Sequence, residues 1–318
     1  MDKISRFRGS LLGLACGDAL GAPLELRMPG SFTPITGMID DNRSRIVKAG
    51  YWTDDTSMAL CLAESLIETK GFDPKDQMDR YTNWYRNGYL SSVGQCFGIG
   101  GTTRNALNRY ACLSEKDGIS SYCGDKSHSK SGNGSLMRLC PVPLVYSFSK
   151  RLADLHSSNS SKTTHGSKAC IDSCRFFSSL IIQALKNEDK NLIFDYPHIS
   201  KTYSLGALDS KVESVALGSY KSKQRPTGSG YVVDCLESAL WAFYNTDNFK
   251  DGALKAANLG NDADTTAAVY GQLAGAFYGV EDIPEEWLEK LVKKDMIQDY
   301  ADKLYDLHLE LSPNSNGE

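Results

Sequence analysis

The chain has 318 residues, 41% of them hydrophobic and 23% charged, so it is long enough and apolar enough to build a folded core. Its formal net charge is −4 and it has no dense run of Lys or Arg, which argues against nucleic acid as the main partner. No segment approaches 18 uninterrupted apolar residues, and the N-terminus lacks a long apolar stretch with a small-residue cleavage site. We therefore expect no membrane span and no secretion, and a cytoplasmic protein.

The nine cysteines and five histidines restrict the kind of metal site that the chain can build. The cysteines form no CxxC pair, are odd in number and mostly have apolar neighbours, which is typical of reduced, partly buried thiols. The histidines form neither HxxxH nor HExxH. A histidine-rich zinc or iron centre is thereby excluded, and ions that prefer oxygen ligands remain.

The first predicted helix covers Phe7–Leu20. Glycines recur along it every four residues and give it a smooth face for close approach of another helix or a ligand. They are Gly9, Gly13, Gly17 and Gly21. Asp18, near the end of this helix, could simply accept hydrogen bonds from backbone amides at a helix end. Glu25, just beyond the turn, is either an exposed loop acid or a mobile carboxylate that reaches a water at a metal site.

Two acidic clusters each precede a predicted helix. Residues 52–56 (Trp-Thr-Asp-Asp-Thr) come before Met58–Ile67, and residues 260–266 (Gly-Asn-Asp-Ala-Asp-Thr-Thr) come before Ala267–Tyr278. Taken singly, either cluster reads more simply as a helix cap, because Asp, Asn and Thr are favoured there. A cap uses one side chain, however, and each cluster has a surplus carboxylate. If the two helix starts meet, they form an all-oxygen cage for one or two Mg²⁺ or Mn²⁺ ions.

Two glycine-rich segments could hold a ligand. Residues 94–104 enter a helix predicted at Ala106–Leu113, and their bare amides could cradle a diphosphate, although the match to GxGxxG is loose. In residues 131–138, glycines allow close approach while Asn133 and Ser135 supply donors; a tight turn that caps a helix is an equal alternative. His165 could stack on or hydrogen-bond a ligand, although a lone histidine is more often structural.

The rest of the chain also reads mainly as helix. Further helices are predicted at residues 171–185, 232–244, 287–296 and 298–311, and polar loops at residues 114–133, 157–167 and 222–230. None of these loops is long enough to separate two cores, and the acidic clusters lie near opposite ends of the chain. We therefore predict a compact all-α fold in which residues 1–318 form a single domain.

Taken together, these segments resemble the ADP-ribosylglycohydrolase family, which includes the dinitrogenase reductase activating glycohydrolases and the eukaryotic ADP-ribosyl-acceptor hydrolases. The motifs that carry the resemblance arrive in the family's order. They are GDALGAPLE at 17–25, WTDDTSMAL at 52–60, SGNGSLMR at 131–138, SGYVVDCLESALWAF at 229–243 and GNDADTTAAVYGQLAGAFYG at 260–279. The resemblance implies a compact all-α domain with a centre of two Mg²⁺ (or Mn²⁺) ions in a cleft.

The resemblance also implies roles for individual residues. Metal ligands would be Thr53, Asp54, Asp55, Asp262, Asp264 and Thr265. Substrate-binding positions would be Gly98, Ile99, Gly100, Gly101, Asn133, Gly134, Ser135, His165 and Tyr231. Glu25 or Asp55 would transfer the proton. The chain departs from the arginine-directed bacterial pattern Phe-Asp-Ile-Gly-Asn-Thr-Thr, because Gly98 and Gly101 replace the aspartate and the asparagine. This departure leaves the acceptor open.

The expected function is metal-dependent hydrolysis of the glycosidic bond between ADP-ribose and an acceptor, such as a protein arginine or serine. Two alternatives remain: hydrolysis of a free ADP-ribose derivative, such as an acylated ADP-ribose, and an inactive relative that only binds ADP-ribose. The expected partner is an ADP-ribosylated protein or a small ADP-ribose-linked substrate. We expect a monomer, because no exposed apolar heptad seam is evident.

Overall fold

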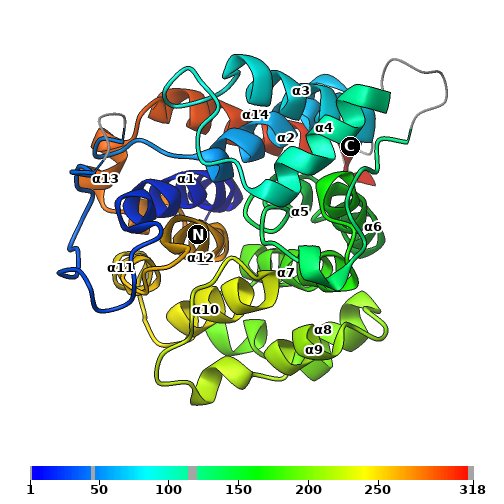
Figure 1. Ribbon diagram of the computed structural model, residues 1–318. Coiled ribbons are helices and arrows are strands. Elements are labelled where there is room, and N and C mark those ends of the chain that lie inside the picture. Colours follow the sequence, from blue (N-terminus) through cyan, green and yellow to red (C-terminus); the bar gives the residue numbers. More distant parts are fainter. Residues whose placement is uncertain (1, 44–46, 114–119, 314–318) are drawn as a thin grey trace.

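The computed structural model describes residues 2–43, 47–113 and 120–313, and within these ranges it is all-α, with fourteen α-helices and no strand (Figure 1). The predicted fold class is confirmed. The helices are α1 (Lys3–Gly21), α2 (Asp54–Glu68), α3 (Pro74–Asn87), α4 (Gly101–Leu113), α5 (Pro141–Val145), α6 (Lys150–Thr164), α7 (Lys168–Lys186), α8 (Tyr196–Tyr203), α9 (Ser210–Ala216), α10 (Val232–Tyr244), α11 (Phe249–Ala257), α12 (Ala263–Tyr278), α13 (Glu285–Lys290) and α14 (Lys294–Leu311).

The two helices α1 and α12 form the centre of the fold, and almost every residue of both is buried. The small-residue face of α1 packs directly against the small-residue face of α12. A Cβ atom built on Gly17 would lie 2.1 Å from the carbonyl oxygen of Ala267, and one on Gly21 would lie 2.3 Å from the Cα atom of Asp264. Only glycine allows backbones to approach so closely. This contact places the end of α1 directly beside the start of α12, where the second acidic cluster lies.

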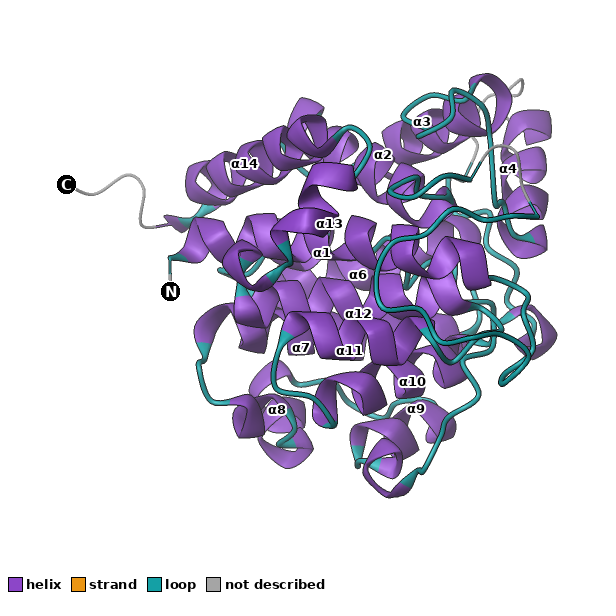
Figure 2. Cartoon of the chain, turned by 90° about the vertical axis from the view of Figure 1, so that its left-hand side faces the viewer, coloured by secondary structure: helices purple, strands orange, loops and turns teal. Residues whose placement is uncertain are grey.

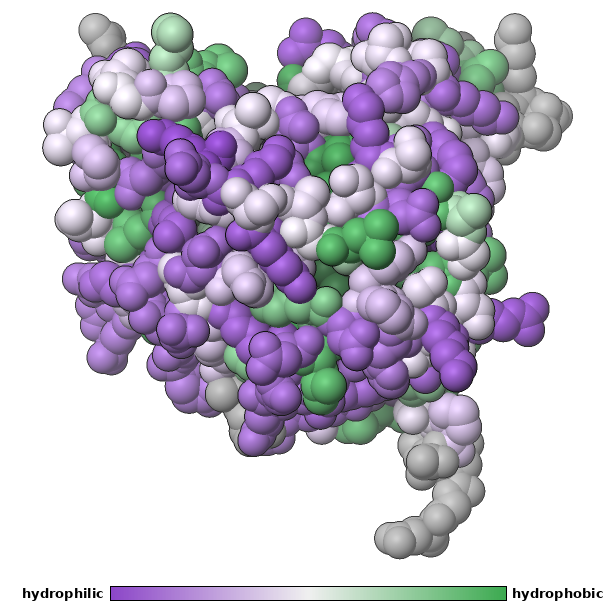
Figure 3. Space-filling model, turned by 90° about the horizontal axis from the view of Figure 1, so that it is seen from below, coloured by the Kyte–Doolittle hydropathy of each residue, from purple (hydrophilic) through white to green (hydrophobic). Residues whose placement is uncertain are grey.

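The other helices surround this central pair. In both ribbon views, α2, α3 and α14 lie on one side of it and α8, α9 and α10 on the opposite side (Figures 1 and 2). The face seen from the α8–α10 side is largely hydrophilic, and its apolar residues occur in small separate groups (Figure 3). None of the helices in the described ranges is long and apolar enough to cross a membrane. All nine cysteines lie in these ranges and are free thiols.

Most predicted helices are confirmed, and several begin a turn earlier than predicted. The helix predicted at 58–67 lies inside α2, which begins at Asp54, and the one predicted at 267–278 lies inside α12, which begins at Ala263. The acidic clusters are therefore part of the first turns of these helices. Part of the loop predicted at 114–133 lies outside the described residues, and residues 120–133 are irregular except for one short turn.

Two sequence predictions about secondary structure are wrong. The loop predicted at 157–167 is helical as far as Thr164, the end of α6. Its small hydroxyl side chains are buried, and several of them bond within the protein; Thr163 Oγ1, for example, donates to the Ser160 carbonyl at 2.7 Å. The helix predicted at 287–296 is interrupted between α13 and α14, where Lys293 has a φ of 58°. A left-handed residue cannot continue an α-helix.

Candidate active site

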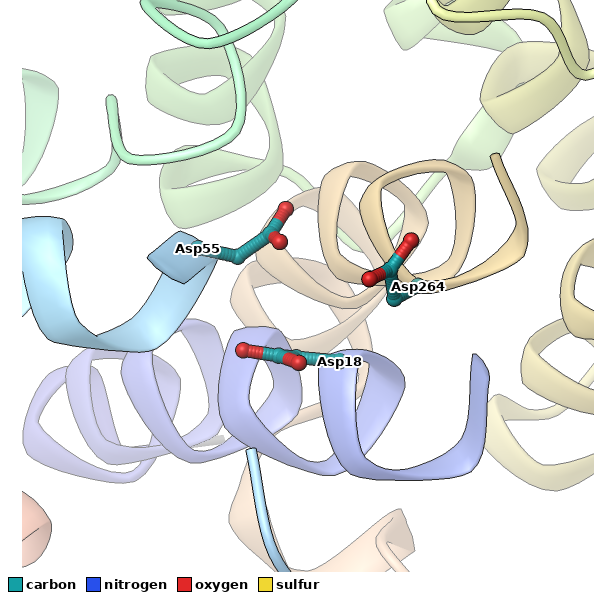
Figure 4. A group of neighbouring side chains, drawn as sticks. All are labelled: Asp18, Asp55 and Asp264. Atoms are coloured by element: carbon teal, nitrogen blue, oxygen red, sulfur yellow. The ribbon is translucent and has the colours of Figure 1, made fainter. Parts of the chain in front are cut away.

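Three buried carboxylates meet where α1, α2 and α12 converge (Figure 4). Asp18 comes from α1, Asp55 from the first turn of α2, and Asp264 from the first turn of α12. An oxygen atom of each lies within 4.8 Å of an oxygen atom of the others, and no side chain of the three is more than 3% exposed. The described residues place no lysine or arginine in an ion pair with them. Three such groups repel one another unless a proton or a cation intervenes.

Asp18 ties α1 to the start of α2. Its carboxylate accepts hydrogen bonds from the amides of Thr53 at 2.9 Å and Thr56 at 3.0 Å, and from both threonine hydroxyls at 3.0 Å and 2.6 Å. The prediction that Asp18 bonds amides at a helix end is confirmed, with α2 as the helix. Burial raises the pKa of Asp18 to about 6, although these hydrogen bonds act in the opposite direction. Asp18 is thus well supplied with donors.

Asp55 and Asp264 have far fewer donors. Asp55 Oδ2 accepts from Thr53 Oγ1 at 3.1 Å, whereas its Oδ1 is buried and has no hydrogen-bond partner among the described residues. Within the described part of the chain, Asp264 accepts one bond, from the Thr265 amide at 2.9 Å. Burial, and then the charges of nearby carboxylates, raise the pKa values of Asp55 and Asp264 well above their ordinary value; the same causes raise the pKa of Asp54 to about 8.

The helix-cap alternative does not account for these acids. Thr53 and Asp262 occupy the N-cap positions of α2 and α12, yet neither side chain makes a capping hydrogen bond. What remains is a set of carboxylate and threonine oxygens, and among the described residues Asp55 Oδ1 is a carboxylate acceptor without a hydrogen-bond partner. Hard divalent cations such as Mg²⁺ and Mn²⁺ prefer this type of donor. The predicted ligand residues therefore fit such an ion.

A cavity of about 240 Å³ opens above this cluster. Residues of both acidic clusters and both glycine-rich segments line it, so the fold unites motifs that are far apart in the sequence. The predicted site residues among its lining are Glu25, Asp54, Gly98, Gly100, Gly101, Asn133, Gly134, His165, Asp262, Asp264 and Thr265. Thr53 and Asp55 are buried and do not line the cavity.

The structure does not bring every predicted substrate-binding residue to this cavity. Ser135 is fully buried, and its hydroxyl lies 2.9 Å from that of Ser161. Ile99 packs against the hydrophobic core. Conversely, the sequence predictions left out Thr102, Thr103 and Met137, which line the cavity. Their only sequence signal was their position within the same motifs.

A second, more open hollow of about 470 Å³ adjoins the cavity and shares Thr102, Gly132 and Gly230 with it. Tyr231 lies here, and its buried hydroxyl has no hydrogen-bond partner within the described ranges. Lys211 also lines the hollow, with Nζ 5.1 Å from the centre of the Tyr231 ring. The acidic cavity therefore continues into a hollow that carries cationic and aromatic groups.

Residues 131–138, hereafter the anchored segment, are fixed to their neighbours on several sides. The Asn133 amide donates to the Gly230 carbonyl at 3.1 Å, and the Val232 amide donates to the Ser131 carbonyl at 3.0 Å. The Asn133 side chain donates to Asp262 at 3.0 Å. One wall of the cavity is thus joined both to the start of α10 and to the second acidic cluster.

Residues 94–101, hereafter the open loop, form a different wall. Gly98 has a φ of 84°, and a Cβ atom there would lie 2.5 Å from Asp54 Oδ1. A side chain at position 98 would be strained at this φ, and the Cβ atom of the aspartate in the arginine-directed pattern would have to displace Asp54. A Cβ atom on Gly100 or Gly101 would meet no atom within 4 Å. This side of the cavity is open.

Glu25 is half-buried and lines the cavity. The next residue, Leu26, has a φ of 60°, and its amide donates to the Asn261 carbonyl at 2.6 Å. This bond holds the Glu25 segment against the start of α12. Burial, with the charges of Asp262 and Asp18, raises the pKa of Glu25 to about 7. A carboxyl group of this kind can exchange protons near neutral pH.

The chain is similar to known ADP-ribosyl hydrolases over nearly its whole length. The family model described as ADP-ribosylglycohydrolase matches residues 1–313. An ADP-ribosylarginine hydrolase Tri1 of Serratia proteamaculans is 39% identical over 306 residues, which cover 96% of this chain and 80% of the relative. An ADP-ribosyl-[dinitrogen reductase] glycohydrolase of Rhodospirillum rubrum is 31% identical, with 91% of each chain covered.

A solved structure agrees. It is titled ADP-ribosylglycohydrolase-related protein complex, superposes with a TM-score of 0.82 at 38% identity, and is matched over 96% of this chain and 99% of its own. The class is therefore that of hydrolases acting on glycosyl bonds. The chain belongs to the ADP-ribosylglycohydrolase family.

Proposed function

We propose that this protein is a metal-dependent hydrolase that removes ADP-ribose from arginine side chains of a protein and so reverses mono-ADP-ribosylation. The observation that carries the proposal is the buried trio of Asp18, Asp55 and Asp264, with its orphaned Asp55 Oδ1, beneath a glycine-lined cavity. The relative named as an ADP-ribosylarginine hydrolase supports arginine as the acceptor.

Two Mg²⁺ or Mn²⁺ ions would be held by oxygens of the two acidic helix starts. The holding residues would be Thr53, Asp54, Asp55, Asp262, Asp264 and Thr265. When bound, the ions would supply positive charge that orients the ribose hydroxyls and makes a nearby water more acidic. Asp18 would hold the start of α2 in place, because its oxygens already accept from Thr53 and Thr56.

Proton transfer falls to a carboxyl group that can reach the cavity. Glu25 lines it, whereas Asp55 is fully buried and does not line it. We therefore assign proton exchange with the water or the leaving group to Glu25, and metal binding to Asp55. Positive charge that develops at the anomeric carbon would be stabilised by the surrounding carboxylates.

The rest of the ligand would follow the anchored segment. Its bare glycines allow the ribose and diphosphate to approach the backbone, and the neighbouring hollow offers Lys211 and the Tyr231 ring for the phosphate and adenosine end. The acceptor would then leave past Gly100 and Gly101 of the open loop, where no side chain narrows the cavity.

The test is release of ADP-ribose from three substrates: an arginine-linked protein, a serine-linked peptide and a free acylated ADP-ribose. Each is assayed with Mg²⁺, with Mn²⁺ and with chelator. We expect metal-dependent release that is fastest from arginine. Equal rates with chelator would contradict the metal requirement, preference for another linkage would contradict arginine, and binding of ADP-ribose without release from any substrate would indicate an inactive relative.

A further inference from the structure

Arg138 is a buried cation whose charge the proposed chemistry does not use. It ends the anchored segment, its side chain is 0% exposed, and none of the described carboxylates pairs with it. Its guanidinium lies 4.7 Å from the centre of the Tyr81 ring. Burial of an unpaired charge is costly, so the neutral groups around it must be arranged to offset that cost.

Those neutral groups link the cavity wall to the end of α6. Nη1 donates to the Gly134 carbonyl at 2.9 Å. Nη2 donates to the Thr163 hydroxyl at 3.1 Å and to the Thr164 hydroxyl at 2.8 Å. The C-terminus of a helix also favours a cation electrostatically. Arg138 therefore fixes the segment that leads into His165.

The hydroxyl groups of Thr163 and Thr164 have different hydrogen-bond acceptors. Thr163 Oγ1 donates to the Ser160 carbonyl at 2.7 Å. Thr164 Oγ1 lies 2.8 Å from His165 Nδ1, and this nitrogen is the acceptor that the described structure offers it. A guanidinium can only donate, so Thr164 Oγ1 accepts from Arg138 Nη2. Donation from Thr164 to Nδ1 is the arrangement that also gives the Thr164 hydroxyl proton an acceptor among the described residues. Nδ1 is then an acceptor, and the neutral imidazole carries its proton on Nε2.

That Nε2 atom faces the cavity. His165 is among the lining residues, and a Cβ atom on Gly134 would lie 3.2 Å from Nε2, so the glycine leaves the ring edge uncovered. Burial, together with the nearby charge of Arg138, lowers the pKa of His165 to about 3, which agrees with a neutral ring.

We propose that Arg138 is a positioning residue that, through the Thr164 hydroxyl, fixes His165 as an Nε2–H donor to an oxygen of the ribose or diphosphate bound in the cavity. The inference rests on the proposed function for the identity of the ligand. The arrangement of Arg138, Thr164 and His165 does not depend on hydrolysis. It can therefore be tested by binding and spectroscopy, without catalytic turnover.

The experiment compares Thr164→Val with Thr163→Val. Both remove a buried hydroxyl that accepts from Arg138, but only Thr164 contacts His165 Nδ1. The tautomer of His165 is read from ¹⁵N shifts of histidine-labelled protein, assigned with His165→Gln, and binding is measured by calorimetry with ADP-ribose and Mg²⁺. Thermal unfolding establishes that each variant is folded.

In the wild type and in Thr163→Val, we expect the Nε2–H tautomer of His165 and a shift of its Nε2 signal when ADP-ribose binds. In Thr164→Val, we expect His165 to lose this single tautomer. The affinity of Thr164→Val for ADP-ribose should fall by about 10-fold, and Thr163→Val should bind within about twofold of wild type. In turnover, the loss should appear in KM rather than kcat.

An Nδ1–H wild type, or equal effects of the two substitutions, would overturn the inference. So would ADP-ribose that binds without moving the Nε2 signal. A Thr164-dependent Nε2–H tautomer that responds to ADP-ribose, in a protein that releases ADP-ribose from no substrate, would support the positioning role while the proposed hydrolysis fails.

Discussion

The anchored segment (131–138) and the open loop (94–101) are both glycine-rich walls of one cavity, yet they are held very differently. The anchored segment bonds to α10, to Asp262 and, through Arg138, to the end of α6. The hydrogen bonds described for the open loop lie near its ends, such as the one from Ser91 Oγ to the Gln95 carbonyl at 2.6 Å. Under the proposed function, the wall that would bind ADP-ribose is therefore fixed, and the wall that would face the acceptor is free to vary.

The largest effect should come from the buried trio of Asp18, Asp55 and Asp264. Asp264→Ala removes a buried carboxylate of the trio and should lower kcat by about 10³-fold or more on every acceptor, with the protein still folded. Asp251→Ala is the matched control, because Asp251 is an exposed first-turn acid of α11. An active Asp264→Ala enzyme would rule out the metal cage.

Gly98→Ala is expected to have the next largest effect. The new Cβ atom would lie 2.5 Å from Asp54 Oδ1 at a φ of 84°, so strain and displacement of Asp54 should lower kcat/KM by about 10- to 100-fold. Gly94→Ala separates the two causes, because Gly94 has a φ of 72° but meets no atom within 4 Å. Equal losses in the two variants would mean that backbone strain, rather than contact with Asp54, is responsible.

The metal-free protein should lose stability as pH rises. The folded-state pKa values of Asp18, Glu25 and Asp54 are raised to about 6, 7 and 8, so the unfolded chain releases these protons more easily than the folded one. The free energy of unfolding should therefore fall between about pH 4 and pH 8. Chemical denaturation in chelator measures this slope. Saturating Mn²⁺ at pH 8 should restore about 2.7 kcal/mol at a concentration of 100 times Kd; a rise of stability with pH would contradict the account.

Gly101→Asn should have the smallest effect, confined to the acceptor. Space around Gly101 is open, so an amide there can contact the leaving group without disturbing the ADP-ribose side. We expect a higher ratio of arginine to serine turnover and an unchanged affinity for ADP-ribose in calorimetry. Gly94→Asn, also in open space but outside the cavity lining, should change neither. A change in the affinity of Gly101→Asn for ADP-ribose would contradict the proposal that the open loop contacts only the acceptor.

The sequence predicted the all-α fold and much of the site because its signals were local. The small-residue face of the first helix indicated close approach of another helix or a ligand, and surplus acids at two helix starts indicated a shared site if those starts meet. The tertiary partners of these residues could not be predicted from sequence. Asp18 does accept from amides at a helix end, but its place in the trio depends on how α2 docks. The Ser135 hydroxyl lies beside that of Ser161, outside the cavity lining.

The secondary-structure errors have a similar cause. The serines and threonines of α6 predict a loop when they are read as exposed, but most of them are buried in the fold, and the hydroxyls of Ser161, Thr163 and Thr164 bond to groups inside it. The interruption at Lys293 accompanies a bond from the Val292 amide to the Gly50 carbonyl at 3.0 Å, a contact between distant segments. Such tertiary contacts override local periodicity.

The most direct test of the central claim is anomalous diffraction at the manganese edge from crystals of this protein soaked in Mn²⁺. The account predicts two peaks, about 3.5–4 Å apart, bonded to oxygens of the two acidic helix starts, with Asp55 Oδ1 among the ligands. A carboxylate trio that stays free of manganese at saturating concentration, in crystals that still bind ADP-ribose, would contradict it.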